Sequence, residues 1–195
     1  MISMPFYLAH GAGAGHSSSF LQQLNRALLS SGIESVIPMT FDYMKQQEAM
    51  GKKRPPPAFA KLIPEYEAVI SKQKKSCVVS GKSMGGRVAS QLSACPMVKA
   101  VVCFGFPFHP AGKTEKHRLA FLQALQVPCL IVQGTRDRLG GFEWVSQQSI
   151  SHLVEIVWVE GADHDFNVLK KYNRNQDDVV NEIAATVVKW LQNAL

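Results

Sequence analysis

The sequence predicts a single α/β domain, built as a three-layer α/β/α sandwich around a mostly parallel sheet of about six strands. Short runs that are apolar throughout alternate along the whole chain with segments whose apolar residues repeat at helical spacing. Strands that are apolar on both faces are typical of parallel sheets covered by helices on either side. No internal repeat or linker-like stretch divides the 195 residues, so we expect one domain over residues 1–195.

The first third of the chain predicts two strands and two helices. A strand is expected over Phe6 to Ala9, and the serines at 17–19 can cap the helix that follows. The next strand is expected over Ser35 to Phe41, followed by a polar loop at 44–57. A second amphipathic helix is expected from Phe59 to Ile70.

The rest of the chain continues the same alternation. The expected strands are Ser76 to Ser80, Ala100 to Gly105, Val127 to Gln133 and Val154 to Val159. The expected helices are Met84 to about Ala94, Phe142 to Ser149, and a last one that carries Val180 to Leu191. This order fits a parallel sheet in which each crossover is helical.

Composition is that of an ordinary globular protein, with 46% hydrophobic and 18% charged residues. The net charge of +6 comes from basic residues in short clusters, such as Lys52-Lys53-Arg54. No RNA-binding motif or zinc-finger spacing accompanies them, so nucleic-acid binding is not expected. A solvated surface that mildly attracts anionic substrates is the better interpretation.

Targeting and metal-binding patterns are not recognisable either. No basic n-region opens the chain, and no apolar run approaches the ~20 residues of a membrane span. The four cysteines lack paired metal spacing, and three lie in predicted buried strands, which favours reduced core thiols. We therefore expect a cytoplasmic protein that binds neither membranes nor metals.

The run Gly81-Lys82-Ser83-Met84-Gly85 follows a predicted strand and opens a predicted helix. This is the G-x-S-x-G pattern of a nucleophile elbow, in which glycines flank a strained serine. A phosphate-binding P-loop is the alternative for Gly81-Lys82-Ser83, but Ser76 stands where that motif has its first glycine. The pattern predicts Ser83 as a nucleophile.

A serine nucleophile needs a base, and the base needs a group that orients it. His164 follows the predicted strand that ends at Val159, and Asp137 follows its own strand at a similar offset. We therefore predict His164 as the base and Asp137 as the acid. Three other carboxylates near the histidine are rivals: Glu160, Asp163 and Asp165.

Acyl chemistry also needs donors for the negative charge on the substrate oxygen. We predict the backbone N–H groups of Met84 and Ala12 as this oxyanion hole, the latter in the loop His10-Gly11-Ala12-Gly13. The alternative for this loop is a dinucleotide site, but it lacks the third glycine of G-x-G-x-x-G. His10 is expected to support the loop.

The other basic residues and histidines near the motifs are assigned supporting roles. Lys82 is expected to contact substrate or to pair with Glu160 or Asp165, and Arg87 to anchor loops. The remaining histidines are expected at the surface or at the substrate's edge: His16, His109, His117 and His152.

These residues together resemble the alpha/beta-hydrolase superfamily, in a small form similar to dienelactone-hydrolase-like proteins. The elbow, the run Gly105-Phe106-Pro107-Phe108-His109-Pro110 and Gln133-Gly134-Thr135-Arg136-Asp137 look more narrowly like the KANSL/testis-expressed hydrolase-like family. The resemblance covers nearly the whole chain and implies Ser83 as nucleophile, Asp137 as acid and His164 as base.

The chain departs from the superfamily pattern in three ways. His10-Gly11 already follows the first strand, so the two customary leading strands are missing. The stretch from His109 to Gln126 is too short for a lid domain, so we expect an open site suited to small or exposed acyl groups. Dienelactone hydrolases proper use cysteine where this chain has Ser83, which argues against that particular activity.

The function predicted from the sequence is a serine hydrolase that cleaves a small-molecule carboxylic ester or thioester through an acyl-Ser83 intermediate, without a cofactor. The alternative is a non-catalytic interaction or scaffold protein that keeps the fold. A separation of Ser83 from His164 beyond hydrogen-bond distance would favour the scaffold.

Overall fold

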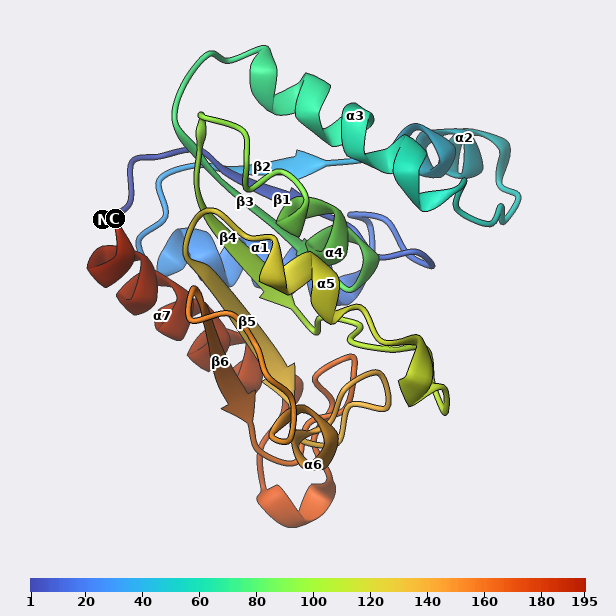
Figure 1. Ribbon diagram of the computed structural model, residues 1–195, viewed down its shortest axis with the longest axis vertical. Coiled ribbons are helices and arrows are strands. Elements are labelled where there is room, and N and C mark those ends of the chain that lie inside the picture. Colours follow the sequence, from blue (N-terminus) through green and yellow to red (C-terminus); the bar gives the residue numbers. More distant parts are fainter.

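Six strands form one parallel sheet in the computed structural model, which describes residues 1–195 (Figure 1). The strands lie in the order β2-β1-β3-β4-β5-β6, and every neighbouring pair is parallel. Their bounds are β1 Phe6–Ala9, β2 Val36–Met39, β3 Cys77–Lys82, β4 Val98–Phe104, β5 Cys129–Gly134 and β6 Val154–Val159. The predicted α/β class and sheet of about six strands are confirmed.

Seven α-helices and two short 3-10 turns accompany the strands, and the last turn and the last helix follow β6. The helices are α1 Ser19–Ser30, α2 Asp42–Met50, α3 Phe59–Ser71, α4 Met84–Ser90, α5 Leu119–Gln123, α6 Phe142–Val145 and α7 Gln176–Ala194. The 3-10 turns are Thr114–Lys116 and Lys170–Tyr172. None of the helices is long and apolar enough to cross a membrane.

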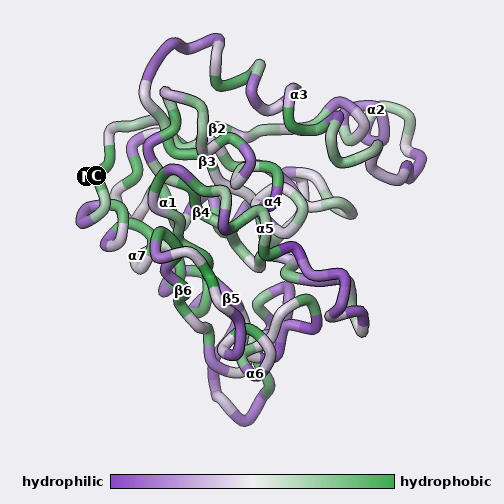
Figure 2. Tube along the Cα trace, viewed as in Figure 1, coloured by the Kyte–Doolittle hydropathy of each residue, from purple (hydrophilic) through white to green (hydrophobic).

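The core is divided into two hydrophobic clusters, one on each face of the sheet. Because side chains alternate along a strand, Phe6 and Leu8 of β1 join one cluster while Tyr7 and Ala9 join the other. Helices α1 and α7 pack on the first face, and α3, α4 and α5 on the second. Figure 2 shows hydrophobic residues concentrated in the strands and hydrophilic ones in the peripheral connections. The result is the three-layer arrangement that the sequence predicts.

Parallel register brings the carboxyl ends of the strands to one edge of the sheet. Ala9 pairs with Gly81, Lys82 with Phe104, and Gly134 with Val159. The connections that follow β1, β3, β4, β5 and β6 therefore start side by side. Ligands of open α/β sheets bind at this edge.

The polar loop predicted at 44–57 is wrong in its first half, where α2 runs from Asp42 to Met50. Only Tyr43 and Met44 of this helix are buried, so it packs on the domain by its first turn alone. A helix that buries one turn leaves almost no apolar periodicity in the sequence. Its left-handed C-cap at Gly51 closes it.

Two predicted helices are shorter than expected. Helix α4 ends at Ser90, where the Ser90 hydroxyl bonds back to the Arg87 carbonyl at 2.8 Å and i→i+3 backbone bonds follow. Helix α6 likewise ends at Val145.

The stretch from His109 to Gln126 contains α5 and no lid domain. The absence of a lid is the arrangement that the sequence predicts. His109, expected at the surface or at the substrate's edge, is not a surface residue: it is only 5% exposed, and its ring centroid lies 4.7 Å from that of Trp144.

Candidate active site

Three side chains from separate connections meet at the carboxyl edge of the sheet. Ser83 follows β3 directly, Asp137 lies three residues beyond β5, and His164 lies five residues beyond β6. Nε2 of His164 is 2.9 Å from Oγ of Ser83, and its Nδ1 is 2.7 Å from Oδ2 of Asp137. The structure therefore brings together the three residues that the sequence singles out.

The backbone of Ser83 is held in a conformation that side-chain-bearing residues avoid. Its φ of 52° and ψ of −112° carry the chain from β3 into α4 in a single residue. Such strain costs about 1–3 kcal/mol and persists only where the surroundings enforce it. Hydrogen bonds do so on both sides, from Ser83 N–H to the Phe104 carbonyl at 2.9 Å and from Arg87 N–H to the Ser83 carbonyl at 3.1 Å.

The glycines of the elbow are required by close packing. A Cβ on Gly85 would lie 2.6 Å from the His10 carbonyl oxygen and 2.7 Å from that of Ala9. A Cβ on Gly81 would collide with the backbone of Gly85. Since these neighbours are backbone atoms, neither can move aside, and the two positions admit only glycine.

The contacts of His164 fix its tautomer. An ionised carboxylate only accepts hydrogen bonds, so Nδ1–H donates to Asp137 and Nε2 is left to accept from the Ser83 hydroxyl. His164 packs against Gly105, whose φ of +67° turns the chain away after β4. A Cβ there would lie 3.2 Å from the His164 carbonyl oxygen.

Asp137 is buried, and its carboxylate is surrounded by donors. Besides His164, the Gln133 side chain donates from Nε2 to Oδ2 at 2.8 Å and the Leu139 N–H donates to Oδ1 at 2.8 Å. These bonds compensate the burial of the charge. This role of Gln133 was not predicted from the sequence. The pattern that indicates it is a polar glutamine near the end of the otherwise apolar strand Cys129–Gly134.

The three rival carboxylates have other partners. Oδ1 of Asp163 accepts the N–H groups of Asp165 and Asn167, both at 2.9 Å, which shapes the loop around His164. Asp165 forms an ion pair with Lys82 at 3.4 Å, one of the two pairings expected for that lysine. Glu160 accepts from the Tyr172 hydroxyl at 3.1 Å. Burial lowers the pKa of Lys82, and the Asp165 carboxylate opposes that effect.

Two backbone N–H groups flank the serine as possible oxyanion donors. Met84 is the first residue of α4, where N–H groups have no acceptor within the helix. The N–H of Ala12 donates to no group of the protein. Both residues lie beside Ser83 in the wall of one cavity.

The loop that carries Ala12 is held by two side chains from below. His10, fully buried, bonds through Nδ1 to the Gly11 carbonyl at 2.7 Å and accepts the Phe41 N–H on Nε2 at 3.1 Å. The Tyr43 hydroxyl donates to the Ala12 carbonyl at 3.0 Å, and burial raises the pKa of Tyr43 to about 12, which keeps it a donor. The support expected from His10 is present, while Tyr43 lies between the predicted strand and the predicted loop at 44–57 and was given no role.

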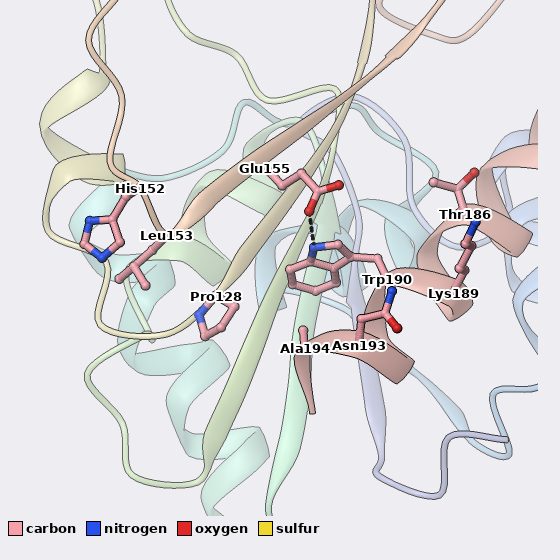
Figure 3. Close-up of a pocket in the computed structure, with 9 residues that line it drawn as sticks. All are labelled: Pro128, His152, Leu153, Glu155, Thr186, Lys189, Trp190, Asn193 and Ala194. Carbon is pink, nitrogen blue, oxygen red and sulfur yellow. Dashed lines mark hydrogen bonds between the residues drawn. The ribbon is translucent and has the colours of Figure 1, made fainter.

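Ser83 and Ala12 line two cavities at once. One of about 580 Å³ contains Lys82, His164 and Asp165, and the other, of about 340 Å³, contains Met84 and Arg87. A third cavity of about 540 Å³ lies elsewhere, at the amino ends of β5 and β6 against α7, where Trp190 donates to Glu155 at 3.0 Å (Figure 3). This third cavity contains neither Ser83, Asp137 nor His164. The first two cavities are therefore the candidate substrate sites.

No three or more His, Cys, Asp and Glu side chains gather in a way that could hold a metal ion. The four cysteines are free, and Cys77, Cys103 and Cys129 are buried in strands.

Comparison with known proteins identifies the family. A family model described as an alpha/beta hydrolase domain matches residues 3–192. The chain belongs to the alpha/beta hydrolase family. The match is to the general family, and the narrower resemblance to KANSL/testis-expressed and dienelactone-hydrolase-like proteins stays a prediction.

Several solved structures share the fold of this alpha/beta hydrolase. An alpha-beta serine hydrolase homologue from Coxiella burnetii is 18% identical with a TM-score of 0.69, over 95% of this chain and 86% of that one. A serine hydrolase without a lid from Xanthomonas campestris is 16% identical with a TM-score of 0.65, over 96% and 83%. The esterase domain of a Rhodothermus marinus protein is 16% identical with a TM-score of 0.65, over 97% and 87%. At these identities the neighbours establish the alpha/beta hydrolase fold alone.

Proposed function

We propose that this alpha/beta hydrolase is a serine hydrolase that cleaves a carboxylic ester or thioester of a small molecule. The observation that carries the proposal is the position of His164, within hydrogen-bond distance of Ser83 on one side and of Asp137 on the other. An imidazole held in this way removes the serine proton and transfers it onward.

The first half of the reaction forms an acyl-enzyme. Ser83 Oγ attacks the carbonyl carbon while His164 Nε2 takes the hydroxyl proton, and the carbonyl π electrons move to the oxygen. The N–H groups of Met84 and Ala12 stabilise that oxygen's negative charge. The intermediate collapses as the bond to the alcohol or thiol breaks, and the imidazolium returns the proton to this leaving group.

The second half uses water in place of Ser83. His164 takes a proton from the water as its oxygen attacks the acyl carbon, and then returns that proton to Ser83 Oγ as the ester bond to the enzyme breaks. The products are the carboxylic acid and the free serine. Asp137 stays ionised throughout, holding the imidazole and stabilising its charged form. Each role is filled by a group of the chain itself.

The lidless edge of the sheet favours short or exposed acyl groups. The scaffold alternative gains no support, because the separation of Ser83 from His164 is 2.9 Å rather than beyond hydrogen-bond reach.

Turnover of a panel of short-chain acyl esters and thioesters tests the proposal. We expect the wild type to hydrolyse at least one class and Ser83→Ala to lose that activity while keeping the melting temperature of the wild type. Absence of turnover on every ester and thioester, or full activity in Ser83→Ala, would contradict it.

A further inference from the structure

The smaller cavity beside Ser83 has an unusual electrostatic composition. It lies between α3, α4 and the β4–α5 connection, with Phe59 and Leu62 in its wall. Arg87 and Arg118 also line it, and no aspartate or glutamate does. The cavity therefore places two positive charges and no negative charge next to the proposed nucleophile.

Arg87 is oriented by packing while its donors stay free. Its guanidinium carbon lies 3.6 Å from the ring centroid of Phe59 and 4.8 Å from that of Phe121. Stacking of this kind orients the guanidinium plane and leaves its edge free to donate. The Nε atom is buried without a hydrogen-bond partner. The terminal Nη groups make no hydrogen bond within the protein either, so they remain available to an acceptor that the protein does not supply.

Arg118 adds a second charge that also lacks a carboxylate. Its Nη1 donates to the Pro107 carbonyl at 2.7 Å, which fixes its position at the cavity. The ion pairs of the protein involve Lys45, Lys82, His164 and Arg174, and neither cavity arginine. Burial, and after it the charge of Arg118, lowers the pKa of Arg87 to about 10. A bound anion would relieve both the repulsion and the lost hydration.

Basic segments lead into the cavity from both sides. Lys52-Lys53-Arg54 precedes the cavity residues Pro56 and Pro57, and Lys113 and Lys116 precede Arg118. These five basic side chains are absent from the ion pairs as well. Apart from Glu115, the charged residues of these two segments are basic, and such an excess of positive charge raises the local concentration of anions.

The proposed mechanism assigns the two cavities to opposite ends of the substrate. His164 must protonate the leaving group, so the alcohol or thiol lies in the cavity that His164 lines. The acyl chain then extends into the other cavity, which carries Met84, Arg87 and Arg118. Guanidinium groups bind carboxylates through paired N–H donors.

We infer that Arg87 and Arg118 form a subsite for a carboxylate at the far end of the acyl chain, so that the preferred substrate is the monoester or monothioester of a short dicarboxylic acid. This inference rests on the proposed function, because the acyl chain is placed by the roles of Ser83 and His164. Arg87 lies one helical turn after Ser83, so an acyl chain of a few carbons spans the distance, and the cavity of about 340 Å³ accommodates it.

The kinetic test compares two esters of equal chain length that differ only at the far end: monoethyl glutarate and ethyl pentanoate. Hydrolysis by the full chain is followed by NMR. We expect kcat/KM to be at least about tenfold higher for monoethyl glutarate, because the guanidinium groups form charge-assisted hydrogen bonds with its far carboxylate and with nothing in ethyl pentanoate. In Arg118→Gln and Arg87→Gln this preference should fall to near unity or reverse, while Arg118→Lys and Arg87→Lys keep part of it.

Arg26→Gln is the matched control, since Arg26 is an exposed arginine of α1 on the other face of the sheet. It should keep the full preference. Equal or faster hydrolysis of ethyl pentanoate by the wild type, or an unchanged preference in both glutamine variants, would overturn the subsite.

A binding test separates this inference from the proposed function. Free glutarate should raise the melting temperature of the wild type and of Ser83→Ala, and should raise it much less in Arg118→Gln. Pentanamide, which has the same chain length and no carboxylate, is the control ligand and should leave all three melting temperatures unchanged. If no ester is turned over and glutarate still binds through both arginines, the proposed function fails and the carboxylate subsite stands. If esters are turned over and glutarate binding is indifferent to both arginines, the subsite fails and the proposed function stands.

Discussion

The side-chain amide of Gln133 donates from Nε2 to Oδ2 of Asp137 at 2.8 Å, and the same oxygen lies 2.7 Å from Nδ1 of His164. The amide also lies 3.2 Å from the Phe106 carbonyl and 3.0 Å from that of Gly140. Gln133 thus connects the end of β5 with two neighbouring loops and holds the carboxylate that faces the imidazole.

Replacing Gln133 by leucine should weaken both stability and turnover. The variant keeps the approximate volume but leaves a buried carboxylate oxygen and two carbonyls without this donor, which should cost about 1–3 kcal/mol of unfolding free energy. We expect kcat to fall about tenfold with KM little changed, because the carboxylate is less well positioned. Gln148→Leu, which removes a glutamine that bonds only to the Trp144 carbonyl, is the control. Wild-type kcat in Gln133→Leu would exclude a positioning role.

Replacing Asp137 by asparagine should abolish most turnover with the fold intact. The change removes the negative charge and permits the wrong imidazole tautomer, which costs about 10⁴ in kcat in serine proteases. Asp163→Asn and Asp165→Asn should lose much less, since these carboxylates contact loop N–H groups and Lys82 instead of His164. Steady-state kinetics of the three variants measure the loss of turnover, and circular dichroism checks that each variant keeps its fold. A crippled Asp165→Asn beside an active Asp137→Asn would mean that the acid is misassigned.

Replacing Gly85 by alanine should destabilise the whole elbow. The new Cβ would lie 2.6 Å from the His10 carbonyl oxygen, so β1 and α4 must separate, at a cost of about 2 kcal/mol or more. Gly13→Ala is the matched control, because a Cβ there meets nothing within 4 Å. Its unfolding free energy should change by less than about 0.5 kcal/mol. Urea titration measures the unfolding free energy of both variants. Equal stability of the two variants would refute the packing argument.

The buried His10 should make stability depend on pH. Burial lowers its pKa to about 4, while in the unfolded chain it titrates near 6.5. The folded state therefore binds fewer protons between these values, so this stability contribution is complete above pH 6.5 and declines as pH falls toward 4. The loss is on the order of 3 kcal/mol. Protonation of Nε2 would also remove the acceptor of the Phe41 N–H.

The pH effect of His10 is isolated by difference. His10→Gln should show a flatter loss of unfolding free energy between pH 6.5 and 4 than the wild type, whereas His117→Gln, at an exposed position, should follow the wild type. Parallel curves for the wild type and His10→Gln would show that His10 does not carry this dependence.

The sheet was predictable because its strands are apolar on both faces. The run from Ala100 to Phe104 is apolar throughout and predicts a buried strand, and the elbow glycines mark where β3 passes into α4. Helix α2 was not predictable, because it buries only Tyr43 and Met44 and its other positions are polar. The ends of α4 and α6 depend on local bonds such as the one from Ser90 to the Arg87 carbonyl, which no periodicity records.

The residues of the candidate site that directly follow strands were predictable from the sequence. Ser83, Asp137 and His164 each follow a strand, so their meeting depends only on parallel order and register. The residues that support them were not visible in the same way. Tyr43 acts on the Ala12 carbonyl, far away in the sequence, and Gln133 acts on Asp137 across a loop. The positive charge that Arg87 and Arg118 give the cavity becomes visible only when α4 and the β4–α5 connection are placed together.

Labelling with a fluorophosphonate probe tests the activated nucleophile most directly, because the probe reacts with a serine only when a base removes its proton. We expect one probe molecule per chain in the wild type, mapped by peptide mass spectrometry to Ser83, with no labelling of Ser83→Ala and strongly reduced labelling of His164→Ala. An unlabelled wild type that is correctly folded, or labelling that persists at another residue in Ser83→Ala, would contradict it.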